Sequence, residues 1–359
     1  MEFNAADDLD LSADLVSLTA ALIDIPSESF DEQRIADAVE RALSLQSHLG
    51  VTRVGNTIVA RTNLGRAERI VIGGHLDTVP ANSNVPHTVR DERLCGLGAC
   101  DMLGGVAVSL HLAAALTEPV YDVTYLFYEC EEVAGEFNGL AKLADSHPEL
   151  LEGDFAILME PSNARVEAGC QGSLRIEVTT TGERAHSARS WMGINAIHNS
   201  AEILERLARY QAREVEIDGL VYREGLNAVG IRGGVAGNVI PDECTVTINY
   251  RYAPSRSAEE AIAHVTEVFA GFDVAVDDNA PGALPGLSDP SVARFIEILG
   301  EAPHPKFGWT DVARFSSLGI PAINFGPGDP SLAHTKDEFV PIAELHRCEA
   351  ALRSWLCGQ

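Results

Sequence analysis

Basic residues are scarce in this chain. It has 26 Lys and Arg against 53 Asp and Glu among 359 residues, which gives a formal net charge of -27. Such an excess of negative charge repels phosphate backbones and anionic lipid, so nucleic-acid or membrane-surface binding would need a local basic patch. The sequence contains no such patch, and we expect neither nucleic acid nor a membrane as a partner.

Long apolar runs are missing as well. The longest mostly apolar stretch, residues 104–116, contains Ser109 and His111 and is too short to span a bilayer. The start of the chain lacks the basic and apolar regions of a secretion signal. The seven cysteines are scattered without a CxxC pair, which favours a reduced, cytoplasmic protein.

The chain nevertheless has enough apolar residues, 46% of the total, for a sizeable core. Apolar runs and helical patterns alternate up to about Gly169 and resume after a loop-forming segment at 280–286, as in an α/β fold. Between them, the pattern changes to the β-α-β-β-α-β order of a ferredoxin-like sandwich. We expect a catalytic domain made of residues 1–171 and 285–359, interrupted by an α+β domain at 172–284.

Within these domains the patterns predict individual elements. In the α/β parts, we expect helices at 15–25, 35–45 and 104–116, and strands at 69–74, 123–128, 155–159 and 322–325. In the inserted domain, we expect strands at 174–178, 228–231, 244–250 and 273–276, and helices at 195–213 and 257–269.

The first of several chemically interesting motifs follows the strand at 69–74, at the edge where open α/β sheets bind ligands. Residues two apart in extended chain face the same side, so Asp77 can reach the ring of His75. A carboxylate in this place is the usual partner of a zinc-binding histidine. On its own, the motif would also suit a core histidine beside an unrelated turn aspartate.

A second motif, Gly96–Asp101, opens the helix predicted at 104–116. Its glycines permit close approach of the backbone to a ligand. Asp101 is equally compatible with a metal ligand and with a helix cap. A phosphate-binding loop is disfavoured because the lysine and hydroxyl of GxxxxGK[ST] are missing.

Three further motifs with acidic or histidine residues follow predicted strands. Glu131 and Glu132 point opposite ways in extended chain, so one can bind metal while the other handles protons. Pro161 holds Glu160 in the extended region and so aims its carboxylate. His334 lies in a loop after the strand at 322–325. Taken singly, these residues would suit a solvated acidic loop and a surface histidine.

Together these positions supply imidazole nitrogens and carboxylate oxygens, a donor set that suits zinc or cobalt. Two ions that share a bridging carboxylate, about 3.5–4 Å apart, could clamp a water and polarise an amide carbonyl. Cys100 and Cys130 lie nearby, and we interpret them as packing residues.

From Ile25-Pro26-Ser27 to the residues after His334, the motifs and their order resemble the co-catalytic zinc amidohydrolases, the family of aminoacylases and carboxypeptidases. The resemblance implies a metallopeptidase-like catalytic domain with a mixed sheet and two divalent ions, zinc foremost and cobalt as a second choice. One ion would be bound by His75, Asp101 and Glu160, and the other by Asp101, Glu132 and His334. Glu131 would be the catalytic base, and Asp77 would orient His75.

The same resemblance gives the inserted domain a role in dimerisation, or as a lid. It implies a homodimer in which His186 reaches across to stabilise the oxyanion. Asn238 and Gly326 would contact substrate, and Arg251 would pair with a substrate carboxylate. The implied substrate is a small anionic N-acyl amino acid.

Residues 168–174, 185–191 and 308–315 resemble one branch of this family, the desuccinylases. They imply hydrolysis of the amide bond of N-succinyl-LL-2,6-diaminopimelate to succinate and LL-2,6-diaminopimelate. The alternatives are another deacylase such as acetylornithine deacetylase, a dipeptidase, or a non-catalytic dimeric metal-binding homologue. Three positions depart from the usual pattern: Leu103 replaces a common lysine, Met159 a frequent glycine, and Ser162 the usual threonine.

Overall fold

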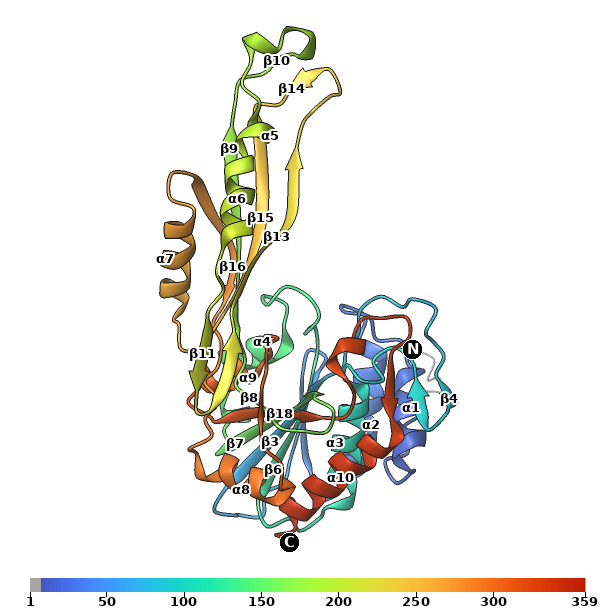
Figure 1. Cartoon of the computed structure of the whole chain (residues 1–359). Coiled ribbons are helices and arrows are strands. Elements are labelled where there is room, and N and C mark those ends of the chain that lie inside the picture. The colour runs from blue at the N-terminus through green and yellow to red at the C-terminus, as the bar shows by residue number, and fades with distance from the viewer. Residues whose placement is uncertain (1–7, 359) are drawn as a thin grey trace. The chain divides into compact units, whose positions relative to one another are not determined.

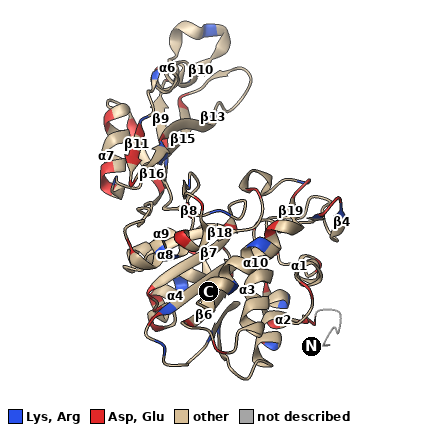
Figure 2. Ribbon diagram, turned by 60° about the horizontal axis from the view of Figure 1, so that its bottom comes forward, with Lys and Arg blue, Asp and Glu red and all other residues tan. Residues whose placement is uncertain are grey.

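The computed structural model describes residues 8–358, which fold into two compact units (Figure 1). Within the described residues, the first unit comprises 8–168, 286–304 and 314–358, and the second comprises 169–285 and 305–313. The domain limits expected from the sequence remain a prediction. The first seven residues, on which the expectation of no secretion signal partly depends, lie outside the described part. Acidic positions are spread over both units (Figure 2).

The first unit is built on a mixed sheet whose central strands run parallel in the order β6-β3-β7-β18. All residues of β6, β7 and β18 are buried, which explains why these strands are continuous apolar runs in the sequence. The shorter strands at either end of the sheet are antiparallel to their neighbours. The strands are β1 (Gly50–Val54), β2 (Thr57–Arg61), β3 (Arg69–His75), β6 (Asp122–Tyr128), β7 (Phe155–Pro161), β8 (Glu167–Ala168), β17 (His304–Pro305) and β18 (Ala322–Gly326).

Helix α3 (Leu103–Ala115) is buried along almost its whole length and packs on β3, β6 and β7. A Cβ atom at Gly105 would collide with the backbone oxygen of Met159, so glycine allows this helix to lie directly on β7. Helices α1 and α10 pack against α3. The other helices of this unit and its edges are α1 (Leu15–Ile23), α2 (Gln33–Ser44), α4 (Gly139–Ser146), α8 (Pro290–Leu299), α9 (Val312–Ser317) and α10 (Ile342–Leu356).

A small second sheet joins two loops of the first unit. Strand β19 (Phe339–Pro341) pairs with β5 (Arg93–Cys95), which pairs with β4 (Thr88–Arg90). The sheet therefore links the segment after His334 to the segment before Asp101. The sequence patterns did not predict it.

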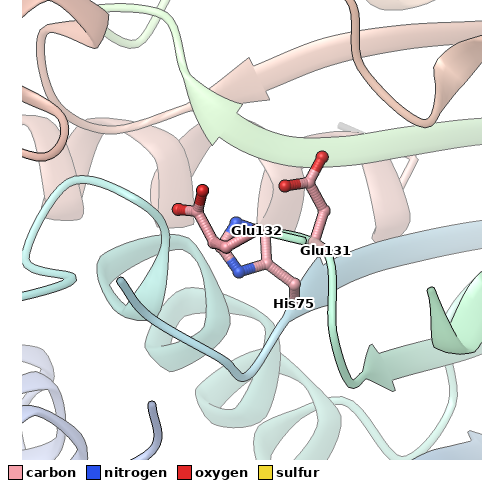
Figure 3. Close-up of side chains that lie close together, drawn as sticks. All are labelled: His75, Glu131 and Glu132. Carbon is pink, nitrogen blue, oxygen red and sulfur yellow. The ribbon is translucent and has the colours of Figure 1, made fainter. Parts of the chain in front are cut away.

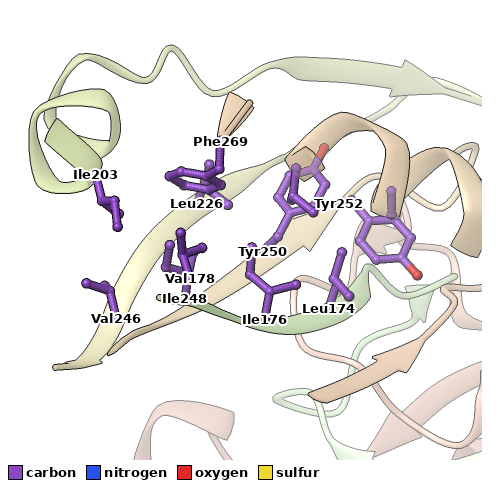
Figure 4. Packing of buried hydrophobic residues seen from close by; sticks show 12 residues of the cluster. Leu174, Ile176, Val178, Ile203, Leu226, Val246, Ile248, Tyr250, Tyr252 and Phe269 are labelled. Atoms are coloured by element: carbon purple, nitrogen blue, oxygen red, sulfur yellow. The ribbon is translucent and has the colours of Figure 1, made fainter. Parts of the chain in front are cut away.

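The second unit has an antiparallel sheet in the order β13-β15-β9-β16. With its helices, this order is that of a ferredoxin-like sandwich, as expected. Leu174, Ile176 and Val178 of β9 alternate with polar residues and face the helices, where they join a core that includes Tyr250 and Phe269 (Figure 4). The main elements are β9 (Gly172–Thr181), α5 (Ala196–Asn199), α6 (Ala201–Arg209), β13 (Gly225–Gly233), β15 (Glu243–Tyr252), α7 (Ala258–Val268) and β16 (Asp273–Ala280).

The second unit departs from the expected pattern in one region. The single helix predicted at 195–213 is two helices that end at Arg209. A hairpin follows, formed by β11 (Glu214–Ile217) and β12 (Leu220–Arg223). Its turn residues, Asp218 and Gly219, have φ angles of 52° and 79°, as a tight two-residue hairpin turn requires.

Two short strands, β10 (Ala185–His186) and β14 (Val239–Ile240), form a separate ribbon in this unit. A 3-10 helix, Ser187–Met192, follows β10. No helix within residues 8–358 combines the length and apolar character needed to cross a bilayer.

Candidate metal centre

The acidic and histidine residues singled out in the first unit meet at the C-terminal edge of the parallel strands. His75 ends β3, Glu131 and Glu132 follow β6, and Glu160 lies near the end of β7. Figure 3 shows both glutamates leaving one loop beside the His75 ring, with their carboxylates directed to different sides of it. Ligand atoms lie within 4.8 Å of one another in three overlapping groups: His75, Asp101 and Glu160; Asp101, Glu132 and His334; and His75, Glu131 and Glu132.

Asp101 lies between the two histidines. Its Oδ1 is 3.3 Å from His75 Nε2, and its Oδ2 is 3.4 Å from His334 Nε2. His334 Nε2 is also 2.9 Å from Glu132 Oε1. Ligands of a tetrahedral zinc ion, bonded at about 2.0–2.1 Å, lie roughly 3.3 Å from each other. The donor spacing therefore fits a pair of ions that share the Asp101 carboxylate.

The pKa values of the two histidines also indicate a site that favours bound cations. Hydrogen bonds to Asp101 and Glu132 raise the pKa of His334 to about 10. Burial opposes the charged form of His75, yet Asp101, Asp77 and Glu131 still raise the pKa of its ring well above the usual value. Carboxylates thus dominate the site, and divalent cations would neutralise their charge.

Asp101 itself is held in the ionised form. Its burial favours the neutral acid, but hydrogen bonds from His334 and His75 outweigh this and hold the pKa of the carboxyl well below its ordinary range. An ionised carboxylate with both oxygens facing imidazole donors is suited to bridging two cations.

Asp77 acts on the site in two ways. His75 Nδ1 lies 2.9 Å from the backbone oxygen of Asp77 and 3.6 Å from its carboxylate. The carbonyl thus accepts a hydrogen bond from Nδ1–H, and the ring is held with Nε2 facing Asp101. The Asp77 carboxylate accepts hydrogen bonds from the amides of Glu131 and Glu132, at 2.9 and 3.1 Å, and from the Ser29 hydroxyl at 2.8 Å. It therefore fixes the loop that carries both glutamates, a role that the sequence did not reveal.

Two buried glutamates near the site were also missed. Glu32 accepts hydrogen bonds from the amides of Phe30 and Cys130, at 2.9 and 3.2 Å. Cys130 has a φ of 56°, an unfavourable angle for a non-glycine residue, and Glu32 holds it there. Glu338 binds the loop before α3, and burial raises the pKa of its carboxyl to about 7. In the sequence, each is only an acid just before a helix or a strand, which usually indicates a surface residue.

The cysteines beside the site are protonated thiols. Burial raises the pKa of Cys130 to about 12 and raises that of Cys100 further. Neither thiol is therefore poised to act as a thiolate ligand.

Gly326 packs directly on the strand end that carries Glu160. A Cβ atom at Gly326 would collide with the backbone oxygen of Met159, so no larger residue fits. The Gly326 amide donates to the Ser162 hydroxyl at 3.0 Å, and that hydroxyl donates to the carbonyl of Arg165 at 2.7 Å. Serine thus supplies the same hydroxyl as the threonine that is usual at this position.

The remaining expected site residues belong to the second unit. His186 and Asn238 lie on the β10–β14 ribbon and its loop, where the Ser187 amide donates to the Asn238 carbonyl at 2.9 Å. The Ala188 amide donates to His186 Nδ1 at 3.1 Å. Because Nδ1 accepts this bond, the proton of the neutral ring resides on Nε2, which can donate to a ligand.

Arg251, on β15, is half-buried, and its Nε donates to the Asn249 side chain at 3.1 Å. Burial lowers the pKa of the guanidinium. In the described part of the chain no carboxylate forms an ion pair with it. A desolvated cation of this kind is well suited to an anionic group of a ligand.

An α/β unit with this donor cluster, joined to an inserted ferredoxin-like unit, has the architecture of a metal-dependent hydrolase. The chain matches the model of Peptidase family M20/M25/M40 over residues 71–357, and it belongs to this family. The family resemblance and the fold class expected from the sequence are confirmed, and the chain is a hydrolase.

Individual relatives cover the whole chain. A Mycobacterium tuberculosis protein, provisionally named succinyl-diaminopimelate desuccinylase DapE, is 54% identical over 353 residues, covering 98% of this chain and 100% of the relative. The succinyl-diaminopimelate desuccinylase of Corynebacterium glutamicum is 50% identical over 359 residues, covering 97% of each. A tripeptidase from Staphylococcus aureus shares the fold, with a TM-score of 0.78 and 22% identity over 95% of this chain and 96% of its own.

Proposed function

We propose that this protein hydrolyses the amide bond of N-succinyl-LL-2,6-diaminopimelate to succinate and LL-2,6-diaminopimelate. The observation that carries the proposal is the likeness, over nearly the full length, to two proteins that bear the name of this desuccinylase. The donor cluster beside Glu131 is consistent with amide hydrolysis. The high identity favours this substrate over those of the acetylornithine deacetylases and dipeptidases.

We propose that His75, Asp101 and Glu160 hold one divalent ion and that Asp101, Glu132 and His334 hold a second. Their overlapping groups of ligand atoms support this assignment. Zinc suits the mixed nitrogen and oxygen donors best, and cobalt suits them next. Such ions would supply Lewis acidity, which lowers the pKa of a water towards about 7 and polarises a carbonyl.

Glu131 is proposed as the general base and acid. It lies beside His75 and Glu132 but outside the two proposed ligand sets. Its carboxylate takes the proton from the attacking water and later delivers that proton to the nitrogen of the leaving amine. Asp77 supports this function because it anchors the Glu131 amide.

Substrate contacts are proposed for the residues of the second unit and for Gly326. His186 would donate from Nε2 to the oxyanion that forms on the amide carbonyl. Arg251 would bind a carboxylate of the substrate in bidentate fashion. Asn238, next to His186, and the backbone at Gly326 would contact the remainder of the substrate.

We also propose a homodimer formed through β13. This strand is an edge of its sheet, and its Val229 and Ile231 side chains are 61% and 55% exposed. An apolar edge strand favours pairing with another chain. The opposite edge, β16, carries Asp273, Asp277 and Asp278, and charged residues oppose such pairing.

A cytoplasmic location is proposed as well, because all seven cysteines are free in the structure. Disulfide-free cysteines are typical of a reducing compartment.

The substrate assignment is tested with zinc-loaded protein assayed on N-succinyl-LL-2,6-diaminopimelate, N-acetylornithine and a dipeptide. We expect kcat/KM for the succinylated substrate to exceed the others by at least about 100-fold, since a site built for a polar group strongly rejects analogues that lack it. A higher kcat/KM for either competitor would contradict the proposal. The Glu131→Gln variant is the control for activity from contaminating enzymes.

A further inference from the structure

Glu338 binds the backbone that leads to Asp101. The residue is 2% exposed. Its Oε1 accepts hydrogen bonds from the amides of Cys100 and Asp101 at 3.0 and 3.1 Å, and its Oε2 accepts one from Gly98 at 3.2 Å. The backbone oxygen of Glu338 accepts a further bond from the Gly96 amide at 3.1 Å. A single buried residue thus binds most of the loop that presents the shared carboxylate.

This loop has two further amide hydrogen bonds within residues 96–101: Leu97 donates to the Asn84 carbonyl at 3.0 Å, and Ala99 donates to the Gly96 carbonyl at 3.2 Å. Its amides are buried in irregular backbone, where each one needs a partner. Met102, the N-cap of helix α3, makes no side-chain capping bond, so its side chain does not hold the loop at the start of the helix. The bonds to Glu338 are therefore a main determinant of where Asp101 lies.

Glu338 also connects the loop to His334. The two residues lie in one segment, and the Glu338 amide donates to the Thr335 carbonyl at 3.3 Å. Directly afterwards, β19 pairs with β5, so that Phe339 lies opposite Cys95. The hydrogen bonds of Glu338 therefore connect the segments that carry Asp101 and His334, two of the three proposed ligands of one ion.

We propose that Glu338 is a positioning residue, whose carboxylate clamps the loop of residues 96–101 and thereby fixes the bridging Asp101 relative to His334. This inference rests on the proposed two-ion site. Glu338 does not touch the ions or the substrate. It acts through the backbone of the ligands.

The carboxylate is suited to this task because both of its oxygens accept hydrogen bonds. In Glu338→Gln, one oxygen becomes an NH2 group that would face the Gly98 amide or the amides of Cys100 and Asp101. In Glu338→Asp, both acceptors remain but lie one methylene farther from the loop. The first change places a donor against an amide donor and breaks part of the clamp, whereas the second keeps both acceptors and lengthens the bonds.

Asp122 provides a matched control. Its buried carboxylate accepts bonds from the amides of Leu64 and Arg66, at 2.7 and 2.8 Å, and from the Thr62 hydroxyl at 3.0 Å. Asp122 begins β6, whereas the proposed site follows the end of that strand. Asp122→Asn therefore disrupts a similar clamp at the opposite edge of the sheet.

The test measures zinc affinity by competition with a chelating dye, and amide hydrogen exchange of the metal-free protein. We expect Glu338→Gln to weaken the binding of at least one zinc ion by about 10–100-fold, as for other groups that support metal ligands. The amides of Gly98, Cys100 and Asp101 should exchange about ten-fold faster. The zinc affinity and amide exchange rates of Glu338→Asp should lie between those of Glu338→Gln and those of the parent. Asp122→Asn should leave zinc affinity unchanged even where it lowers Tm.

The proposal is overturned if Glu338→Gln binds both ions within two-fold of the parent, or if Asp122→Asn weakens them equally. If Glu338→Gln does not fold, Glu338→Asp takes its place. The proposal is then overturned if Glu338→Asp binds both ions within two-fold of the parent, or if Asp122→Asn weakens their binding equally. A parent protein that binds two ions but does not cleave the succinylated substrate would contradict only the proposed function. A parent that binds no zinc would contradict the positioning role together with the metal site.

Discussion

At the scale of single residues, the site depends on how Asp101 is placed. Its two carboxylate oxygens face two different histidines, at 3.3 and 3.4 Å. None of the surrounding residues is unusual by itself, and each had an ordinary explanation in the sequence. Their convergence is what gives them a common chemical meaning.

Glu131 gives the sharpest residue-scale prediction. In Glu131→Gln, we expect kcat to fall about 1,000-fold, because the amide cannot accept a proton and general acid–base catalysis contributes roughly 10²–10⁴-fold. The zinc content should stay at that of the parent, since Glu131 lies outside both proposed ligand sets. Steady-state kinetics and atomic emission on the same samples test this. A kcat within ten-fold of the parent, or loss of zinc, would exclude the proposed role.

The sequence predicted the residues of the site better than it predicted their contacts. His75, Glu131 and Glu132 could be identified because they follow recognisable strands, and Asp101 because it precedes the apolar helix α3. That the Asp77 carboxylate binds the amides of Glu131 and Glu132 could not, since those backbone groups approach only after β3 and β6 have paired. Buried acids such as Glu338 stayed hidden because acidic side chains are ordinarily exposed.

At the scale of elements, burial decides which ones the sequence reveals. The strands β3, β6, β7 and β18 are continuous apolar runs and were predicted within one or two residues. By contrast, β4 is exposed at every position and has no periodic pattern. The hairpin β11–β12 has strands of only four residues, and its clearest signal, Asp218-Gly219, lay beyond an overlong helix prediction.

Helix α3 yields a prediction in which packing opposes propensity. Gly105→Ala should raise helix propensity by about 1 kcal/mol. It should nevertheless destabilise the protein by about 1–3 kcal/mol, because the new methyl group collides with Met159 on β7. Urea unfolding measures the difference, with Ala114→Gly in the same helix as a propensity control. A variant as stable as the parent would show that α3 does not lie as closely on β7 as described.

The core of the second unit contains a buried carboxylate, paired with a half-exposed arginine, that predicts a pH effect. Glu224 has a fully buried side chain that accepts bonds from Arg213 at 2.7 and 2.9 Å and from the Tyr250 hydroxyl at 3.1 Å. Burial alone would raise the pKa of Glu224, but the hydrogen bonds from Arg213, the Ala253 amide and Tyr250, together with the charge of Arg213, outweigh it, and the pKa is lowered. Glu224 therefore stabilises the fold above the ordinary glutamate pKa of 4.5, and this contribution is lost as the pH falls below that value.

Accordingly, Glu224→Gln should lower the free energy of unfolding by about 1.5–3 kcal/mol at pH 7, since it weakens the hydrogen bonds of a buried charged group. The difference from the parent should shrink below about pH 4. The control is Glu177→Gln, which removes an exposed pair with Arg232 and should leave the free energy of unfolding nearly unchanged at both pH values. Urea titrations at both pH values decide the matter. If the loss in free energy of unfolding caused by Glu224→Gln grew as the pH fell, the proposed role of the ionised carboxylate would be contradicted.

At the scale of the whole molecule, assembly is expected to depend on one edge of one sheet. Ile231→Lys should convert the proposed homodimer to monomer, because a charge on β13 opposes edge pairing. Val276→Lys is the matched control on the opposite edge, where the side chain is 46% exposed. Sedimentation equilibrium gives the mass of each variant. If Val276→Lys were monomeric and Ile231→Lys still dimeric, the dimer interface would lie at β16 and not at β13.

The central claim is that Asp101 bridges two divalent ions, and anomalous diffraction at the zinc edge from zinc-loaded crystals tests it most directly. We predict two peaks about 3.5–4 Å apart. One should lie about 2.0–2.2 Å from donor atoms of His75 and Glu160, the other at this distance from Glu132 and His334, and both at this distance from Asp101. A single peak, or two peaks that share no ligand, would contradict the account.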